Sequence, residues 1–443
     1  MSLKTLLELL RQQGATRYLA KILAPNDNSK NQFYVGGSSE VFSILPPISI
    51  IPDQNQKGIP SFKASLDFSW VTSTGERLTA PDARLIYYPQ YPEVRLSSLI
   101  QGCPLAPSEL LKSRDPGRVL VLGVSSDKKI FGYLASAGDP VAKEVLSLER
   151  APDDGVFITL SHDVKKEKPH ELLFDELCRV SRKGWISGMR LARNKQLLPC
   201  RSTNCGGYTL EAELGISSNG YSEPDFLGWE VKSFSVPTIP SERSVVVTLM
   251  TPEPTGGYYT SHGPEAFIRK YGYPDRRGRL DRLNFGGIYR VGAKHETTRL
   301  TMNLDGSDKC GTILRSDGHI ALTDEDDQIA ASWSFKTMLE HWNRKHSKAA
   351  FVPNMMRLLD SGIREYQYGN HIRIGEGTDF QLLLRSFATG AVYYDPGLKI
   401  EAASSDNPRT KRRSQFRTTT SKLQTLYHSW REVDACAHGR SDS

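Results

Sequence analysis

Three carboxylates and one lysine lie close together near the middle of the chain. Glu230 and Lys232 are two positions apart, and Glu211 and Asp225 precede them. Side chains alternate between the two faces of a strand, so Glu230 and Lys232 are predicted to share a face. Paired carboxylates such as Asp225 and Glu230 supply the oxygen ligands that Mg²⁺ prefers. A lysine beside a metal-bound water favours loss of its proton, so the set predicts metal-assisted phosphodiester hydrolysis.

Glu211 lies in a segment, residues 207–215, whose spacing predicts a short helix. Leu210 and Leu214 are one turn apart, and Gly215 follows as a stop signal. We therefore expect Glu211 beside an apolar stripe, where it supports the metal or its water shell, and Glu213 at the surface. The tripeptide Glu-x-Lys alone is more typical of an exposed ion pair on a solvated strand, and only its surroundings favour catalysis.

Residues 206–234 resemble the catalytic core of the MvaI/BcnI-type restriction endonucleases, a branch of the PD-(D/E)XK nuclease superfamily. The segment reads GGYTLEAELGISSNGYSEPDFLGWEVKSF. The family's helix glutamate, its Pro-Asp-Phe and its Glu-x-Lys fall on Glu211, Asp225, Glu230 and Lys232. The resemblance implies that Asp225 and Glu230 bind Mg²⁺, with Mn²⁺ as a substitute, and that Lys232 polarises the nucleophile.

The same resemblance places base reading far beyond the catalytic strand, at residues 393–399 and 411–417. Side chains suited to base edges in the major groove are Asp395, Lys399, Arg413, Gln415 and Arg417. One sequence does not separate contacts to bases from contacts to phosphates. His371 is a further candidate reader, although a structural histidine is the commoner case.

The N-terminal part of the chain resembles the effector domain of EcoRII-type enzymes, a DNA-binding pseudobarrel, at residues 20–27, 83–88 and 102–105. The resemblance implies two loop arms in the major groove. The first arm would hold Lys30, Asn31, Gln32 and Tyr34, and the second Glu93 and Arg95.

The second arm has suitable chemistry for reading a base pair. An arginine side chain can donate two hydrogen bonds to guanine, while a carboxylate accepts one from the cytosine amino group. Tyr91 and Val94 stand where the family has arginine and lysine, so weaker or altered contacts are expected. The alternative is that Glu93 and Arg95 form an exposed ion pair on a hairpin.

Charge supports a polyanionic partner. The chain has 57 Lys+Arg against 50 Asp+Glu, a net charge of +7. Residues 406–431 include seven basic residues and one acidic residue, and a second basic stretch, 276–282, follows Tyr271 and Tyr273. Basic clusters with interleaved aromatic residues suit phosphate contact and predict strong salt dependence, with a solvated basic face as the alternative.

Length and composition predict two domains, since 443 residues with 38% hydrophobic residues can bury two cores. A charged run ending in proline, residues 164–169, marks the boundary. Before it, short alternating segments separated by turn residues indicate a small or half-open barrel. We expect an α+β protein, with a β-rich DNA-binding pseudobarrel at 1–165. A PD-(D/E)XK nuclease domain at 170–443 is expected to have a mixed sheet flanked by helices.

Cysteine usage and hydropathy both indicate an intracellular protein. Six cysteines are sparse for this length and suggest no disulfide framework. Cys200 and Cys205 could hold half a zinc site, but no second pair follows, so free thiols are expected. No apolar run approaches about 18 residues, and the first 15 residues suggest an amphipathic helix rather than a signal peptide. We expect a prokaryotic cytoplasmic protein without a membrane contact.

Together these patterns predict a Mg²⁺-dependent type II restriction endonuclease of double-stranded DNA, activated by a second site at the N-terminal domain (type IIE). The joint resemblance suggests the site CCWGG, two sites per functional complex and a monomer with no obligate protein partner. One alternative is a modification-dependent endonuclease, which an aromatic pocket in the first domain would favour. The other is a non-catalytic DNA-binding regulator, which the four catalytic residues disfavour.

Overall fold

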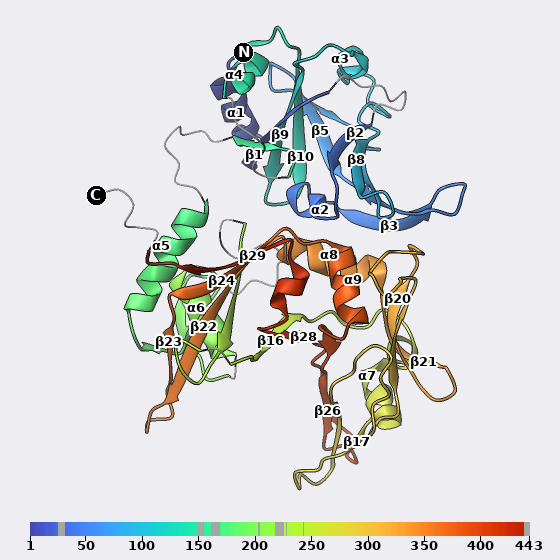
Figure 1. Cartoon of the computed structure of the whole chain (residues 1–443), viewed down its shortest axis with the longest axis vertical. Helices are drawn as coiled ribbons and strands as arrows, with labels where there is room; N and C mark the ends of the chain where they lie inside the picture. Colours follow the sequence, from blue (N-terminus) through green and yellow to red (C-terminus); the bar gives the residue numbers. More distant parts are fainter. Residues whose placement is uncertain are drawn as a thin grey trace. The chain divides into compact units, whose positions relative to one another are not determined.

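The computed structural model describes residues 1–24, 32–148, 152, 155–160, 169–202, 204–217, 226, 228–241 and 243–437. The chain divides into two compact units, residues 1–166 and 167–443, each with a hydrophobic core of its own (Figure 1). None of the described helices combines the length and the apolar character that a membrane crossing demands.

Two sheets form the first unit, with the orders β11-β1-β9-β10-β5-β6 and β2-β8-β7-β4-β3. The strands are β1 (Ala15–Ile22), β2 (Phe33–Gly36), β3 (Ser49–Gln54), β4 (Pro60–Ser65), β5 (Asp67–Val71), β6 (Arg77–Thr79), β7 (Arg84–Tyr88), β8 (Glu93–Ser97), β9 (Val119–Ser125), β10 (Lys129–Ala135) and β11 (Ile158–Leu160). The helices are α1 (Leu3–Gln12), α2 (Val41–Ile44), α3 (Ser108–Lys112) and α4 (Pro140–Leu146). Strands β5 and β10 pair in parallel, and the other described pairs of this unit are antiparallel.

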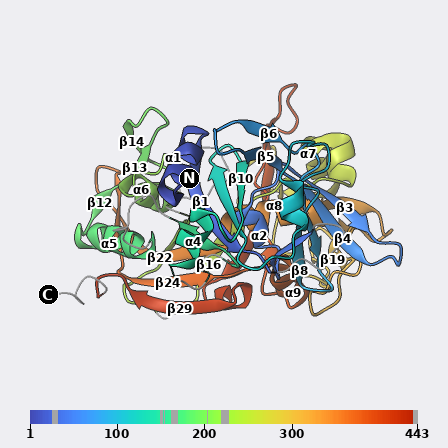
Figure 2. The same ribbon diagram turned by 90° about the horizontal axis from the view of Figure 1, so that it is seen from above.

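Helices α1 and α4 cover the larger sheet of this unit (Figures 1 and 2). Leu6, Leu7 and Leu10 are buried at helical spacing and join the core that β1 and β9 contribute. Gly123 of β9 permits α1 and the start of β1 to lie close to this strand. A β-carbon at Gly123 would lie 2.8 Å from the Ala15 side chain and 3.3 Å from Leu10 Cβ.

The expected N-terminal pseudobarrel is not confirmed. The short alternating segments do form strands, but the described strands make two open sheets and do not close into a barrel. Alternation sets which residues face the core, whereas closure depends on pairing between strands that are distant in sequence.

The second unit contains a mixed sheet, as expected for the C-terminal part. Its order is β12-β23-β22-β24-β29, and β15 pairs in parallel with β22. The strands are β12 (Ile186–Ser187), β15 (Glu230–Ser235), β22 (Lys348–Leu358), β23 (Arg364–Tyr368), β24 (His371–Glu376) and β29 (Ser429–Asp434). Helices α5 (Pro169–Arg182) and α6 (Cys205–Glu213) supply buried side chains to the core that also holds residues of β15, β22 and β24.

The remaining elements of this unit build three small antiparallel sheets and further helices (Figure 1). The sheets are β16-β28-β25, β17-β18-β26-β27 and β19-β20-β21, and β13 pairs with β14. Their strands are β13 (Met189–Leu191), β14 (Leu197–Pro199), β16 (Val246–Met250), β17 (Tyr273–Pro274), β18 (Arg282–Gly286), β19 (Thr301–Asp305), β20 (His319–Thr323), β21 (Ile329–Ser334), β25 (Tyr393–Tyr394), β26 (Gly397–Glu401), β27 (Arg409–Lys411) and β28 (Phe416–Thr419). The helices are α7 (Tyr258–Tyr271), α8 (Phe335–Lys345), α9 (Phe380–Ala388) and the 3₁₀ turn η1 (Leu423–Leu426).

The expectation of free thiols at Cys200 and Cys205 is wrong, and so is the expectation that the six cysteines form no disulfide framework. Cys178 is bonded to Cys436, and Cys200 to Cys205. The first pair spans 258 residues and meets because α5 and the end of β29 belong to one core. A bond between residues so far apart has no signature in local sequence spacing.

Candidate active site

Strand β15 presents Glu230 and Lys232 together. Nζ of Lys232 lies 2.7 Å from Oε1 of Glu230, and their side chains are 17% and 4% exposed. Val231, between them, points into the core on the other face. Strand alternation therefore places the carboxylate and the ammonium side by side, as the spacing predicts.

Helix α6 carries Glu211 and packs directly on β15. The Thr209 hydroxyl accepts from the backbone N–H of Met189 at 3.0 Å, and the Tyr368 hydroxyl donates to the Gly206 carbonyl at 2.6 Å. Burial raises the pKa of Tyr368, so this phenol keeps its proton. These bonds hold the helix against the sheet, and Glu211 is half-buried near the strand that bears Glu230.

Glu213 is not the surface charge that was expected. Its side chain is only 7% exposed and lies 2.6 Å from Nζ of Lys183 and 3.3 Å from Nη1 of Arg179. Arg179 lies in the last turn of α5, and Lys183 directly follows that helix. Both cations contact the end of α6. Glu213 thus ties two helices together, a contact that helical spacing alone does not reveal.

Asp225 lies outside the described residues. Immediately after it, Phe226 and Trp229 exchange backbone hydrogen bonds of 2.9 and 2.8 Å, forming a tight turn that leads into β15. The described residues alone contain no group of three His, Cys, Asp or Glu side chains placed to hold a metal. The described oxygen ligand beside Lys232 is the Glu230 carboxylate, which fits a hard cation such as Mg²⁺ better than a softer metal.

Sequence reasoning missed a polar network behind the site. Asn354 of β22, 1% exposed, donates to the Ser233 hydroxyl at 2.7 Å and accepts from the Ser235 hydroxyl at 3.0 Å. Gly206 of α6 approaches the same amide, since a β-carbon there would lie 3.2 Å from Nδ2. Asn354 therefore ties β22 to β15, and α6 packs closely against its amide. Its signal in the sequence is one amide within the apolar segment AAFVPNMM.

In the first unit, the structure brings four candidate effector residues together on β8 and beside β2. Arg95 donates through Nε and Nη2 to both oxygens of Glu93, at 2.7 and 2.9 Å, and through Nη1 to Oε1 of Gln32 at 3.2 Å. Tyr34, 47% exposed, is the register partner of Arg95. The ion pair considered as the alternative is thus present. Lys30 and Asn31 lie outside the described residues.

Among the candidate base readers of the second unit, Lys399 lies on β26 and Arg417 on β28, and the other three lie in the segments between strands. Arg417 and Asp395 form an ion pair of 2.5 Å, and Lys399 lies 2.7 Å from Glu401. Arg413 is exposed. Gln415 is buried, and its backbone carbonyl accepts from the Asp395 N–H at 2.8 Å.

His371 lies apart from these residues. It is exposed at the start of β24, in the mixed sheet that carries β22. The structure therefore gives no support for grouping it with the other candidate readers.

The chain is similar to known restriction endonucleases. A model of the MvaI/BcnI restriction endonuclease family matches residues 174–427, more than half of the chain. The solved complex of restriction endonuclease MvaI with its cognate DNA substrate is similar, with 18% identity, a TM-score of 0.44 and coverage of 60% of this chain and 99% of that chain. MvaI without DNA shows 16% identity and a TM-score of 0.32, over 61% and 100% of the two chains. A search of curated proteins gave no match.

Proposed function

The chain belongs to the MvaI/BcnI restriction endonuclease family, and on this basis we propose a Mg²⁺-dependent type II enzyme that cuts double-stranded DNA at CCWGG. The observation that carries the catalytic part is the Glu230–Lys232 pair on β15, with α6 and Glu211 packed against that strand. All of these residues lie within the matched region 174–427.

In the proposed reaction, Asp225 and Glu230 would hold the metal, and Glu211 would support it. The bound ion supplies Lewis-acid charge at the scissile phosphate. Lys232 stabilises the negative charge of the attacking oxygen and of the pentavalent phosphate through its ammonium group. Asn354 keeps β15 in register with β22, so that Glu230 and Lys232 face the DNA from a fixed strand.

For base reading we assign Asp395, Lys399, Arg413 and Arg417 to contacts with the recognition sequence. Arg417 is oriented by Asp395 and by a 3.2 Å hydrogen bond from Nε to the Thr248 hydroxyl. Gln415 is buried, so in this proposal it acts through its backbone, by positioning Asp395.

We assign the first unit to effector binding, as in a type IIE enzyme. Gln32, Tyr34, Glu93 and Arg95 would contact a second copy of the site, together with Lys30 and Asn31. The support is the resemblance at these positions and the joining of Gln32, Glu93 and Arg95 in one hydrogen-bonded set. A single chain would then engage two sites without an obligate protein partner.

The direct test incubates the whole protein with unmethylated phage DNA and Mg²⁺ and sequences the resulting ends. Ends confined to CCWGG are expected. Ends confined to another short sequence would support the endonuclease activity but would show that the recognition sequence is not CCWGG. Cleavage of methylated DNA alone would favour a modification-dependent enzyme, and cleavage of neither DNA would overturn the proposed activity.

A further inference from the structure

The hairpin formed by β17 and β18 ends in an exposed basic turn that the functional assignments above leave unused. Residues 276–281 are all exposed, and they include Arg276, Arg277 and Arg279. Leu280 beside them is 95% exposed. None of the three arginines forms an ion pair within the described part of the chain, so their charge is available to an external anion.

Asp275 organises this turn. Its Oδ1 accepts from the backbone N–H groups of Arg277 and Arg279, at 2.8 and 3.2 Å, and its Oδ2 accepts from the Asn284 amide at 2.9 Å. These bonds, with Arg282 at 3.6 Å, lower the pKa of Asp275 to about 2. The carboxylate is therefore ionised, and its hydrogen bonds are made to groups of the hairpin itself. These bonds hold the turn in one shape before any ligand binds.

A second brace holds the far side of the turn. The Asp281 carboxylate accepts from the Ser404 N–H at 2.7 Å, and its carbonyl accepts from the Ala403 N–H at 3.0 Å. Arg269 of α7 donates to the Ala403 carbonyl at 2.8 Å. These hydrogen bonds join the connection between β26 and β27 to the turn, so each segment stabilises the other.

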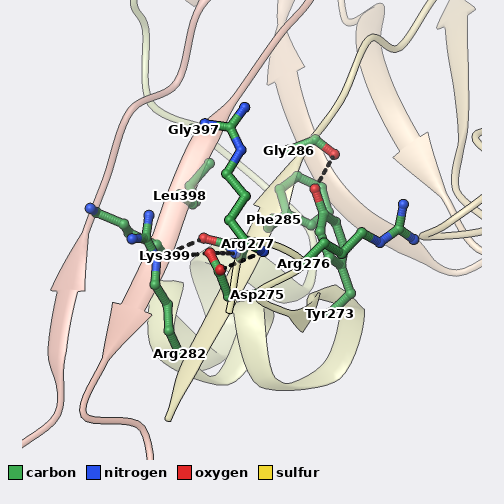
Figure 3. A pocket seen from close by; sticks show the side chains of 11 residues that line it. Tyr273, Asp275, Arg276, Arg277, Arg282, Phe285, Gly286, Gly397, Leu398 and Lys399 are labelled. Carbon is green, nitrogen blue, oxygen red and sulfur yellow. Dashed lines mark hydrogen bonds and ion pairs between the residues drawn. The ribbon is translucent and has the colours of Figure 1, made fainter. Parts of the chain in front are cut away.

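A pocket of about 370 Å³ lies between the hairpin and β26. Figure 3 shows Asp275 with labelled arginines and Lys399 around it. Arg276 lies over the Tyr273 ring at 5.0 Å, which gives the pocket an aromatic and a cationic wall. Lys399, a candidate base reader, lines the opposite side and pairs in register with Asn284.

The position of the turn relative to β26 indicates where along the DNA it would act. Arg282 pairs with Glu401, the last residue of β26, so the turn at 276–281 projects beyond the end of that strand. If Lys399 reads a base, the turn reaches DNA outside the recognition sequence. The guanidinium group of arginine can donate two parallel hydrogen bonds to phosphate oxygens, and such contacts do not depend on the base sequence.

We propose that the β17–β18 turn is an arm that grips the sugar–phosphate backbone flanking the recognition sequence. Arg277 and Arg279 contact phosphates, and the pocket behind them receives one phosphodiester unit beside Arg276. Asp275 is the positioning residue. This inference rests on the proposed function, because it requires the second unit to bind double-stranded DNA.

The test measures binding of the whole protein to duplexes with and without CCWGG, in Ca²⁺, over a range of salt concentrations. The double variant Arg277→Ala/Arg279→Ala should bind both duplexes about tenfold more weakly at low salt, and its log–log salt slope should be shallower by about 2. The control, Lys309→Ala, removes a charge from another exposed loop of this unit and should bind normally.

A substitution of Asp275 separates two explanations of DNA binding, general attraction and the ordered turn, because they predict opposite changes in affinity. Asp275→Ala removes a negative charge, so general attraction predicts tighter binding, whereas loss of the ordered turn predicts weaker binding by several-fold. Asp275→Asn keeps the Oδ1 acceptor and should bind nearly normally. Thermal unfolding of each variant verifies that the fold is retained.

Two failures are distinguishable. If the double arginine variant behaves like its control, or Asp275→Ala binds more tightly, the arm is wrong while the endonuclease assignment stands. If the unaltered protein neither binds nor cuts DNA, the proposed function itself is wrong.

Discussion

Nζ of Lys232 lies 2.7 Å from Oε1 of Glu230, and both side chains are largely enclosed on one face of β15. A buried carboxylate is strongly disfavoured unless a cation or hydrogen bonds compensate it. The lysine therefore compensates the enclosed Glu230 side chain, while Glu230 keeps the Lys232 side chain at the site. We propose that each side chain has two roles, one in the folded strand and one in the chemistry.

Lys232→Ala and Glu230→Gln should each lower the rate of DNA cleavage by about 10³-fold or more, because they remove charge stabilisation or a metal ligand. Specific binding in Ca²⁺ should change little, since neither side chain is assigned to a base. Single-turnover cleavage and gel-shift titration measure the two effects. Lys195→Ala, an exposed lysine of the same unit, serves as the control. Substantial cleavage by Lys232→Ala would remove that lysine from the mechanism.

Asn354→Ala should destabilise the second unit by about 1–3 kcal/mol, because it leaves the hydroxyls of Ser233 and Ser235 without their amide partner. Urea denaturation measures this loss. Cleavage should fall further than the population of folded protein explains, since the register of β15 sets the geometry of Glu230 and Lys232. Asn354→Asp, which places a carboxylate at this buried position and removes the donor to Ser233, should not recover the stability. Normal cleavage by a stably folded Asn354→Ala protein would limit this residue to packing.

The locally encoded parts of the site could be predicted from the sequence. The Glu230–Lys232 pairing follows from two-residue alternation, and the helix around Glu211 follows from leucine spacing, although α6 begins and ends two residues earlier than the expected 207–215. In the first unit, alternation likewise indicated strands that became β7, β9 and β10.

The parts that depend on pairing between distant segments could not be predicted. Asn354 meets Ser233 across 121 residues because β15 and β22 pair in parallel. The Cys178–Cys436 bond spans 258 residues. The enclosure of Glu213 by α5 and the absence of a closed barrel among the described strands have the same cause. Local periodicity fixes which face a residue occupies, but it does not say which distant element covers that face.

Cleavage by the unaltered protein should require Mg²⁺ or Mn²⁺ and stop in EDTA, while Ca²⁺ should support binding without cleavage. The larger and more flexible oxygen shell of Ca²⁺ positions an attacking water poorly. Parallel cleavage and binding assays with each ion provide the measurement, and readdition of Mg²⁺ after EDTA is the control. Full activity in EDTA would contradict both the metal and the roles given to Asp225 and Glu230.

The effector role of the first unit predicts that cleavage by the intact protein is stimulated by an added oligonucleotide carrying the site. A fragment of residues 169–443 begins with α5 and holds every proposed catalytic residue, so it should cut its site without such stimulation. Arg95→Ala should mimic the deletion, because loss of a bidentate guanine contact costs about 1–3 kcal/mol of discrimination. Saturating oligonucleotide should then largely restore the rate.

Arg77→Ala is the matched control for Arg95→Ala, since Arg77 is an exposed arginine of the same unit that lies on β6 in the other sheet. This variant should respond to the oligonucleotide normally. The two proteins should also differ on plasmids, where the intact chain cuts two-site DNA faster than one-site DNA and Arg95→Ala does not. If the intact protein and the fragment cut both plasmids at equal rates, with or without oligonucleotide, then the Glu93–Arg95 pair is only a surface ion pair and the first unit has no effector role.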